Sequence, residues 1–222
     1  MDFSKYRIPG STRQRENIEW SVSYCYNAPD KESPRILLIG DSIVKASQQW
    51  VREQLRSDAN ISFWATSKCV SDPDYLRELD FVTDGGPCSM MFFNNGLHAL
   101  TSAPSEWRSA YANTVRFLQD KLPGIPLILM LSTPSRSEKI TDTIFTMNQW
   151  VVEFAKQNGL PVLDWFSPVA VLEKTAWVDD FHFRPDVFEM LASLISGEVR
   201  KRISGGGLEQ QPTLTGPDGI LK

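Results

Sequence analysis

Residues that bind metals or form disulfides are scarce in this sequence. Its 222 residues include three cysteines and two histidines. The cysteines, Cys25, Cys69 and Cys88, are odd in number and irregularly spaced, which predicts free thiols rather than a disulfide framework. Because no CxxC or HxxxH spacing occurs, we predict no metal site. Acid–base chemistry by imidazole is limited to His98 and His182.

The sequence also lacks an excess of basic residues and a long apolar run. Its formal net charge is −4, and phosphate binding needs a basic face, so we expect no nucleic-acid partner. No stretch approaches the roughly 20 apolar residues of a membrane span, so we expect no membrane partner. Residues 1–12 are polar and carry no signal-peptide pattern, which predicts a cytoplasmic protein. No pattern indicates an oligomeric state.

Five short apolar runs have the composition of buried strands, and longer amphipathic segments separate them. The runs cover residues 35–40, 61–65, 90–93, 126–131 and 161–165. Helical periodicity of three and four residues begins near Val44, Trp107, Ile144 and Pro185. Strands that alternate with helices form βαβ units. The predicted fold class is therefore α/β, a three-layer α/β/α sandwich with a central parallel sheet of about five strands.

The two ends of the chain differ from this pattern, and we predict one domain over residues 34–203. Residues 1–33 are a polar N-terminal extension, in which the alternating segment 20–26 could add an edge strand or line a pocket. Residues 204–222 are rich in Gly, Pro and Gln, which predicts a flexible C-terminal tail.

The first candidate site is the turn Gly40-Asp41-Ser42 after the first buried strand. In an open parallel sheet, sites form beyond the carboxyl ends of the strands. A serine there lies at a helix N-terminus, where backbone N–H groups and the helix dipole can stabilise an oxyanion. The alternative is that Asp41 or Ser42 only caps the helix.

The second candidate is the segment 177–183, in which Asp179 precedes His182 by three residues. A nucleophilic serine needs a base, and that base needs a partner that fixes its tautomer. An aspartate at this spacing can turn back to bond the far imidazole nitrogen. The alternative is a surface loop with a solvated Asp179-Asp180 pair and a half-buried histidine.

The third candidate is Asn94-Asn95-Gly96, where another apolar run ends. An amide at a strand terminus can donate a hydrogen bond to a developing oxyanion. The alternative is a simple Asn-Asn-Gly turn. We expect a structural or substrate-side role for the nearby His98.

In their joint order, these three segments resemble the sequence blocks of the SGNH/GDSL hydrolase superfamily, and the resemblance covers about residues 34–203. It implies a flavodoxin-like fold without metal or cofactor. It also implies that Ser42 is the nucleophile and an oxyanion donor through its N–H, and that Asn94 donates through its side chain. Asp179 and His182 would complete the triad.

The chain departs from the family pattern at two blocks. The family's G-x-N-D is replaced by Phe92-Phe93-Asn94-Asn95, and the run FNNGLH resembles a subgroup found among carbohydrate esterases. The family's second-block glycine has no match in residues 66–71, where the backbone N–H of Ser67 is the predicted oxyanion donor.

The predicted function is hydrolysis of a short-chain ester, first of all an acetyl ester on a carbohydrate. The alternatives are an acyltransferase with the same triad and a non-catalytic ligand-binding α/β module. Predicted substrate contacts are Asp41, Asn95, His98 and Trp177, although aromatic residues at strand ends more often belong to the core. A cysteine nucleophile paired with His98, either Cys69 or Cys88, lacks the strand-to-helix turn and is the weaker prediction.

Overall fold

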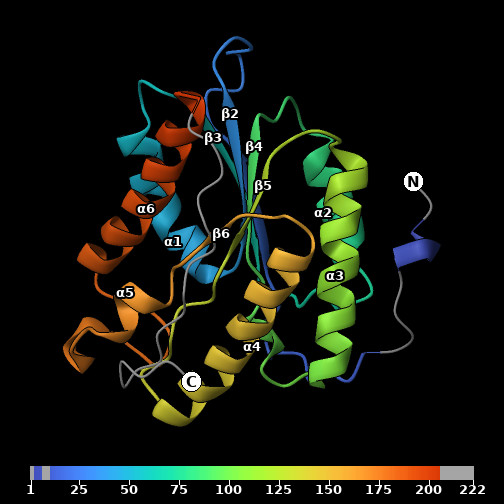
Figure 1. Ribbon diagram of the computed structural model, residues 1–222, viewed down its shortest axis with the longest axis vertical. Helices are drawn as coiled ribbons and strands as arrows, with labels where there is room; N and C mark the ends of the chain where they lie inside the picture. The colour runs from blue at the N-terminus through green and yellow to red at the C-terminus, as the bar shows by residue number, and fades with distance from the viewer. Residues whose placement is uncertain (1–2, 7–10, 206–222) are drawn as a thin grey trace.

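The computed structural model describes residues 3–6 and 11–205 (Figure 1). Its strands are β1 (Ser21–Cys25), β2 (Arg35–Gly40), β3 (Asn60–Thr66), β4 (Met90–Phe93), β5 (Leu127–Met130) and β6 (Val162–Leu163). Its α-helices are α1 (Ser42–Gln54), α2 (Tyr75–Thr83), α3 (Pro104–Lys121), α4 (Glu138–Gln157), α5 (Ser167–Ala170) and α6 (Pro185–Ile203). Three short 3₁₀ helices are η1 (Ser4–Tyr6), η2 (Leu97–Ala99) and η3 (Lys174–Ala176).

The strands form one sheet in the order β1-β3-β2-β4-β5-β6. β2 to β6 pair in parallel, and β1 joins the edge antiparallel to β3. Without β1, the parallel strands follow the doubly wound order of flavodoxin-like folds, in which ligands bind outside the carboxyl ends of the strands. The predicted three-layer α/β/α class is confirmed.

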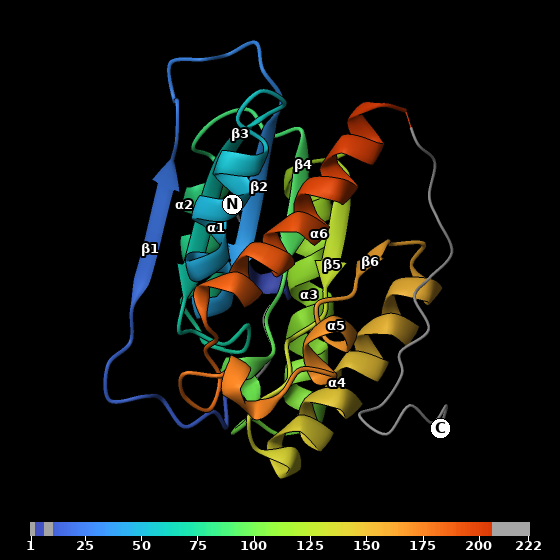
Figure 2. The ribbon, with the colours of Figure 1, turned by 90° about the vertical axis from the view of Figure 1, so that its left-hand side faces the viewer.

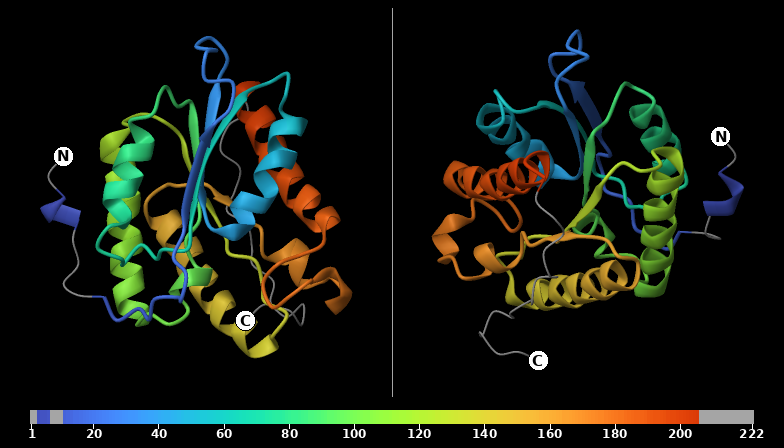
Figure 3. Two further views of the ribbon diagram at one scale, coloured as in Figure 1. Left: turned by 180° about the vertical axis from the view of Figure 1, so that it is seen from behind. Right: turned by 45° about the horizontal axis from the view of Figure 1, so that its top comes forward.

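Helices cover both faces of the sheet, and alternate side chains of each strand enter two different cores (Figures 1 and 3). In β2, Ile36 and Leu38 face the core with α1, α5 and α6, whereas Leu37 and Ile39 face the core with α2, α3 and α4. A strand covered on both faces reads as an unbroken apolar run. This explains why residues 35–40 carry no polar alternation.

The helix ends follow local signals in the sequence. Asp41 is the N-cap of α1, Pro185 is the first residue of α6, and Gly159 takes φ +64° just after α4. Proline suits a first helical position, and glycine suits the left-handed conformation that ends a helix. In Figure 1 the parallel strands run downward, so that their carboxyl ends, the starts of α1 and α6 and the loop before α6 face the lower half of the molecule.

In the N-terminal segment, η1 packs against α3, and residues 11–20 pass below the sheet before β1 forms its outer edge (Figure 2). Residues 20–26 contain β1, whose Ser21 pairs with Thr66 of β3. The predicted tail lies, from residue 206 onward, outside the described residues. Among the residues that the structure covers, no helix is long and apolar enough to span a bilayer.

Candidate active site

Ser42 is the first residue of α1, directly beyond the carboxyl end of β2. The turn before it is tight: a β-carbon at Gly40 would lie 2.4 Å from Val44 Cγ2. Asp41 Oδ1 accepts a hydrogen bond of 2.9 Å from the backbone N–H of Ile43 and thereby caps the helix. Because Ser42 is the first residue of α1, its N–H has no acceptor within the helix. That N–H and the positive end of the α1 dipole are therefore available to an anion.

The structure brings the three predicted triad residues into one hydrogen-bonded row. Ser42 Oγ lies 2.8 Å from His182 Nε2, and His182 Nδ1 lies 2.8 Å from Asp179 Oδ2. These distances allow proton transfer from the hydroxyl to the ring while the carboxylate orients the ring. The alternative in which Asp179 and His182 belong to an unrelated surface loop does not describe this geometry.

The Asp179–His182 turn is held by the aspartate itself. Asp179 Oδ1 accepts hydrogen bonds of 2.8 Å from the backbone N–H groups of Phe181 and His182. Partial burial favours the neutral carboxyl, but these N–H groups and the His182 ring together hold the pKa of Asp179 below its usual range. Asp179 is therefore an anion at neutral pH, as an orienting group for imidazole must be.

Asn94 directly follows β4, and its side chain is buried beside the loop that follows β5. Its side-chain nitrogen donates 2.9 Å to the Met130 carbonyl and 3.1 Å to Ser132 Oγ. Both amide hydrogens thus have acceptors. Service as an oxyanion donor would require the longer contact, to Ser132, to yield to a substrate oxygen.

The prediction that Ser67 donates its N–H to an oxyanion is wrong. That N–H donates 3.0 Å to the Trp20 carbonyl, because β1 and β3 continue to pair beyond the strand end. The Ser67 hydroxyl donates 2.7 Å to Glu19 Oε2, and Ser67 is fully buried. A buried N–H that already donates to a backbone carbonyl cannot bind a substrate oxygen.

Asn95 and Asp41 do not reach a substrate either, which corrects their predicted binding roles. Asn95 is 2% exposed and bridges two loops: its Oδ1 accepts from Val70 N–H, and its Nδ2 donates to the Lys68 carbonyl. Asp41 is 1% exposed and caps α1. Both residues fix the loops around the site from inside.

His98 and Trp177, the other two predicted substrate contacts, are also mostly enclosed. His98 Nδ1 lies 2.6 Å from Glu16 Oε1, and its side chain is 14% exposed. Trp177 is 8% exposed, and its ring packs against Phe183 at 5.3 Å between centroids. The structural alternative therefore describes Trp177 better than sugar stacking does.

Sequence reasoning missed the contribution of residues 11–20 to the site. The Arg13 guanidinium donates to Asp72, to the Ser67 carbonyl and to the His98 carbonyl. It thereby ties the loop after β3 to the loop after β4. The only available signal was the concentration of charged residues between Arg13 and Glu19, which local patterns cannot match to partners.

The cysteines are placed unfavourably for nucleophilic chemistry. Cys69 is fully buried, and burial raises the pKa of its thiol and also that of Cys88. A thiol must ionise to attack, so this raises the barrier to cysteine chemistry.

Within residues 3–6 and 11–205, no group of three or more metal-ligating side chains is gathered in one place.

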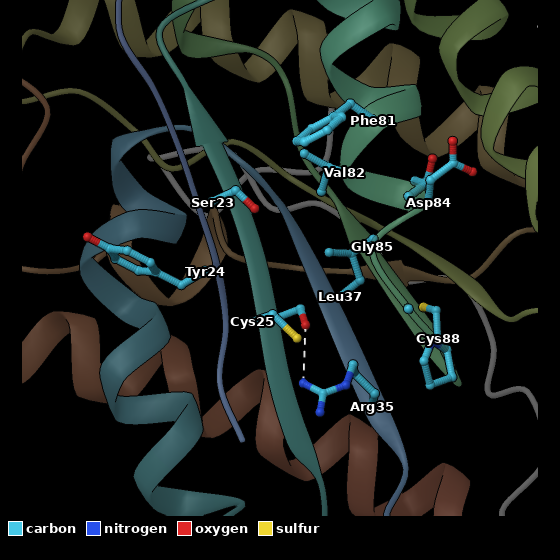
Figure 4. Close-up of a pocket in the computed structure, with 14 residues that line it drawn as sticks. Ser23, Tyr24, Cys25, Arg35, Leu37, Phe81, Val82, Asp84, Gly85 and Cys88 are labelled. Atoms are coloured by element: carbon cyan, nitrogen blue, oxygen red, sulfur yellow. Dashed lines mark hydrogen bonds between the residues drawn. The ribbon is translucent and has the colours of Figure 1, made fainter. Parts of the chain in front are cut away.

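A separate pocket of about 240 Å³ lies at the opposite, amino edge of the parallel strands (Figure 4). It is bordered by Cys25 at the end of β1, Arg35 at the start of β2 and Cys88 before β4. Neither Ser42 nor His182 lines it. The triad and this pocket are therefore independent features.

Comparison with known proteins gives a likeness of fold. No protein-family model matches the sequence, and no curated protein matches it significantly. A GDSL-like lipase from Bacteroides thetaiotaomicron is similar in structure, with a TM-score of 0.63 at 15% identity, covering 79% of this chain and 92% of that one. A carbohydrate esterase of family 3 from Talaromyces cellulolyticus gives 0.64 at 14%, covering 78% and 100%.

A third solved structure adds a bound saccharide to the comparison. It is a family two carbohydrate esterase from Clostridium thermocellum in complex with cellohexaose, with a TM-score of 0.62 at 12% identity, covering 79% of this chain and 66% of that one. Identities this low establish architecture rather than activity. The chain has the fold of the SGNH/GDSL hydrolases.

Proposed function

We propose that the protein is a serine esterase that transfers an acyl group to Ser42 and then to water. The observation that carries this proposal is the row Ser42–His182–Asp179, joined by two contacts of 2.8 Å. Nucleophile, base and orienting carboxylate come from two distant segments of the chain. A helix cap or a solvated loop would not require them to meet.

In the proposed mechanism, Asp179 accepts a hydrogen bond from the Nδ1–H of His182, so that Nε2 presents its lone pair to the Ser42 hydroxyl. As Ser42 Oγ attacks the ester carbonyl, Nε2 takes the hydroxyl proton. It then passes the proton to the leaving alcohol, which departs. Water attacks the acyl-enzyme by the same route and releases a carboxylic acid.

The tetrahedral oxyanion has a donor in the Ser42 N–H, reinforced by the α1 dipole. Asn94 is the second donor, and its amide gives up the hydrogen bond to Ser132 Oγ when it donates to the oxyanion. The loop after β3 supplies no donor at Ser67. We therefore assign two donors to the oxyanion.

For the substrate, we propose a short acyl ester on a carbohydrate. Support comes from the sequence run FNNGLH and from the similar solved structures, two of which are described as carbohydrate esterases. An acyltransferase would use the same triad with an alcohol in place of water.

The test is hydrolysis of a chromogenic acetate ester and of an acetylated oligosaccharide by the wild-type protein and by Ser42→Ala. We expect wild-type turnover, and a loss of about 10⁴-fold or more in Ser42→Ala. The exposed serine variant Ser105→Ala is the control. Equal turnover by Ser42→Ala and wild type would refute the proposal, and no turnover by either would favour a ligand-binding module.

A further inference from the structure

Of the basic side chains in the part of the chain that the structure describes, Arg13, Arg35 and Lys68 are buried. Arg13 and Lys68 each form ion pairs with carboxylates. Arg35 is 4% exposed, and no carboxylate among the described residues pairs with it. Buried charges are normally paired, because removing a charge from water is costly. The Arg35 guanidinium therefore lacks the counter-charge that the other two side chains have.

The Arg35 guanidinium is held in place by neutral oxygens. Nη1 donates 2.7 Å to the Tyr26 carbonyl and 3.3 Å to Ser62 Oγ, and Nη2 donates 3.0 Å to the Asn27 carbonyl. An arginine side chain has five N–H groups. Nε–H and one N–H of Nη2 thus have no acceptor among the described residues. The side chain is fixed and still has donors available.

Arg35 borders the pocket of about 240 Å³ at the amino edge of the parallel strands (Figure 4). Cys25 of β1 lies opposite Ser62 of β3, and Ser62 lies opposite Leu37 of β2. Residues that are directly opposite share a face of the sheet, and the segment 81–88 also lines the pocket. A cavity of about 150 Å³ accommodates benzene. The pocket therefore has room for a small ring or a short chain.

The surroundings of Arg35 in this pocket are mainly apolar. Among the residues that line it, Arg35 is the one cation and Asp84 the one anion. The Asp84 carboxylate pairs with Lys121 at 2.5 Å and lies far from Arg35 in Figure 4. Burial raises the pKa of the Cys88 thiol, and the charge of Arg35 opposes this. The pocket thus offers one positive charge beside apolar walls.

We propose that this pocket binds a small monocarboxylate with an apolar body, whose carboxylate accepts hydrogen bonds from the available N–H groups of Arg35. A carboxylate accepts from two guanidinium N–H groups at once. Its single negative charge matches the single cation of the lining, whereas a phosphate carries about −1.5 to −2. Because neither Ser42 nor His182 lines the pocket, this inference does not rest on the proposed esterase function.

The direct test titrates the protein with benzoate and with benzamide, a neutral ligand of the same shape, and follows chemical shifts by NMR. We expect saturable benzoate binding with a Kd on the order of 1 mM. Benzamide should bind at least about tenfold more weakly, because it lacks the charge that Arg35 recognises. Equal affinity for the two ligands, or no saturation by benzoate, would overturn the proposal.

A change at Arg35 tests the role of the charge. Arg35→Gln should weaken benzoate binding by about tenfold or more. Arg52→Gln is the matched control, because it removes an exposed cation of α1 that does not line the pocket. Benzoate should bind this control as it binds the wild type. Equal affinities of folded Arg35→Gln and Arg52→Gln would contradict the assignment.

A second variant leaves Arg35 and its bonds to the backbone in place. Ser23 is exposed on the edge strand β1, lines the pocket and shares a face of the strand with Cys25. Strands accept aromatic residues well, so Ser23→Trp should fold and fill the pocket. We expect it to abolish benzoate binding. Undiminished binding by this variant would overturn the proposal even if Arg35→Gln did not fold.

Thiol labelling locates the bound ligand. Cys25 is exposed and borders the pocket, whereas Cys69 is buried elsewhere. At ten times its Kd, benzoate leaves about one pocket in ten free, so alkylation of Cys25 by iodoacetamide should slow by up to about tenfold. Benzamide at the same concentration should slow it no more than about twofold, and Cys69 should stay unmodified.

The labelling also separates this pocket from the triad. Ser42→Ala should bind benzoate and protect Cys25 as the wild type does, whether or not the wild type hydrolyses esters. Bound benzoate that leaves the Cys25 rate unchanged, or binding that is lost in Ser42→Ala, would place the carboxylate at another site and overturn the proposal.

Discussion

Gly96 and Ser132 are packed so closely that a β-carbon at position 96 would lie 2.0 Å from Ser132 Oγ. Ser132 is in turn anchored by α4, because its N–H donates 2.9 Å to Asn148 Oδ1 and its carbonyl accepts 2.8 Å from Asn148 Nδ2. The hydroxyl is thereby held against Asn94. The glycine of FNNGLH is required by this contact rather than by its backbone conformation.

We expect Gly96→Ala to destabilise the fold by about 1–3 kcal/mol, because the added methyl displaces Ser132 in a packed region. The loss should appear in denaturant unfolding. Gly197 is the matched control, since a β-carbon there has nothing within 4 Å and the residue lies inside α6. Gly197→Ala should be neutral or stabilising by up to about 1 kcal/mol. Equal effects of the two changes would argue against the packing explanation.

The variants Asn94→Ala and Ser132→Ala should differ in kcat. Loss of one oxyanion donor typically costs about 10²–10³ in kcat, and we expect this for Asn94→Ala. Ser132→Ala removes only a competing acceptor of the Asn94 amide, so its kcat should stay within about tenfold of wild type. Steady-state ester hydrolysis measures both. If Asn94→Ala kept full activity, the oxyanion would depend on backbone donors alone.

Asp179 and Asp180 are adjacent, but only Asp179 bonds the imidazole. Asp179→Asn should preserve the turn and lower kcat by about 10⁴-fold, because the amide favours the wrong tautomer of His182. Asp180→Asn should cost far less. Ester assays with circular dichroism as a folding control distinguish them. Similar losses for both would indicate a general electrostatic role.

The lowered pKa of Asp179 determines how this residue's contribution to the stability of the fold changes with pH. A carboxyl with a depressed folded pKa stabilises the fold above its unfolded value of about 3.9, and this contribution is lost as pH falls through the folded value. Asp179 therefore stays ionised at neutral pH. We expect kcat/KM to rise with pH along a one-proton limb as the imidazole loses its proton. A limb of slope two would show that a second group of the triad also titrates.

The Arg13–Asp72 ion pair is buried, with a distance of 2.6 Å and side chains that are 1% and 2% exposed. Removing Arg13 leaves the buried charge of Asp72 without its partner, so Arg13→Met should destabilise the fold by about 3–5 kcal/mol. Lys5→Met, at the exposed Lys5–Asp120 pair, should cost far less, because solvent screens that pair. Denaturant unfolding compares them. A small loss at Arg13 would mean that the buried pair is replaceable.

The sheet and the triad could be predicted because their signals are local. Doubly buried strands such as residues 35–40 read as apolar runs, and the carboxyl ends of parallel strands must share one edge. That rule places Ser42 near Asn94 before any coordinates are known. The spacing of Asp179 and His182 lies within one turn, so their contact also follows from the sequence.

The oxyanion loop could not be predicted, because its bonding depends on a partner far away in the chain. No local pattern marks Ser67, because its N–H finds its acceptor, the Trp20 carbonyl, only when β1 pairs with β3. Likewise, Asn95 was expected in the cleft, but its amide bonds the backbone at Lys68 and Val70. Helix α2 was missed although it carries apolar side chains at helical spacing, with Tyr75 and Leu79 buried, because its nine residues are too short for periodicity to decide.

The attachment of residues 11–20 has a consequence for the smallest piece of this protein that could work. The parallel strands and the triad lie within residues 34–203, but the carbonyls of Ser67 and His98 and the carboxylate of Asp72 are held by Arg13. A fragment trimmed to residue 34 would keep every triad residue and lose the clamp that fixes two of the loops around it. Protein engineers who transplant this site would need to carry the clamp along with the sheet.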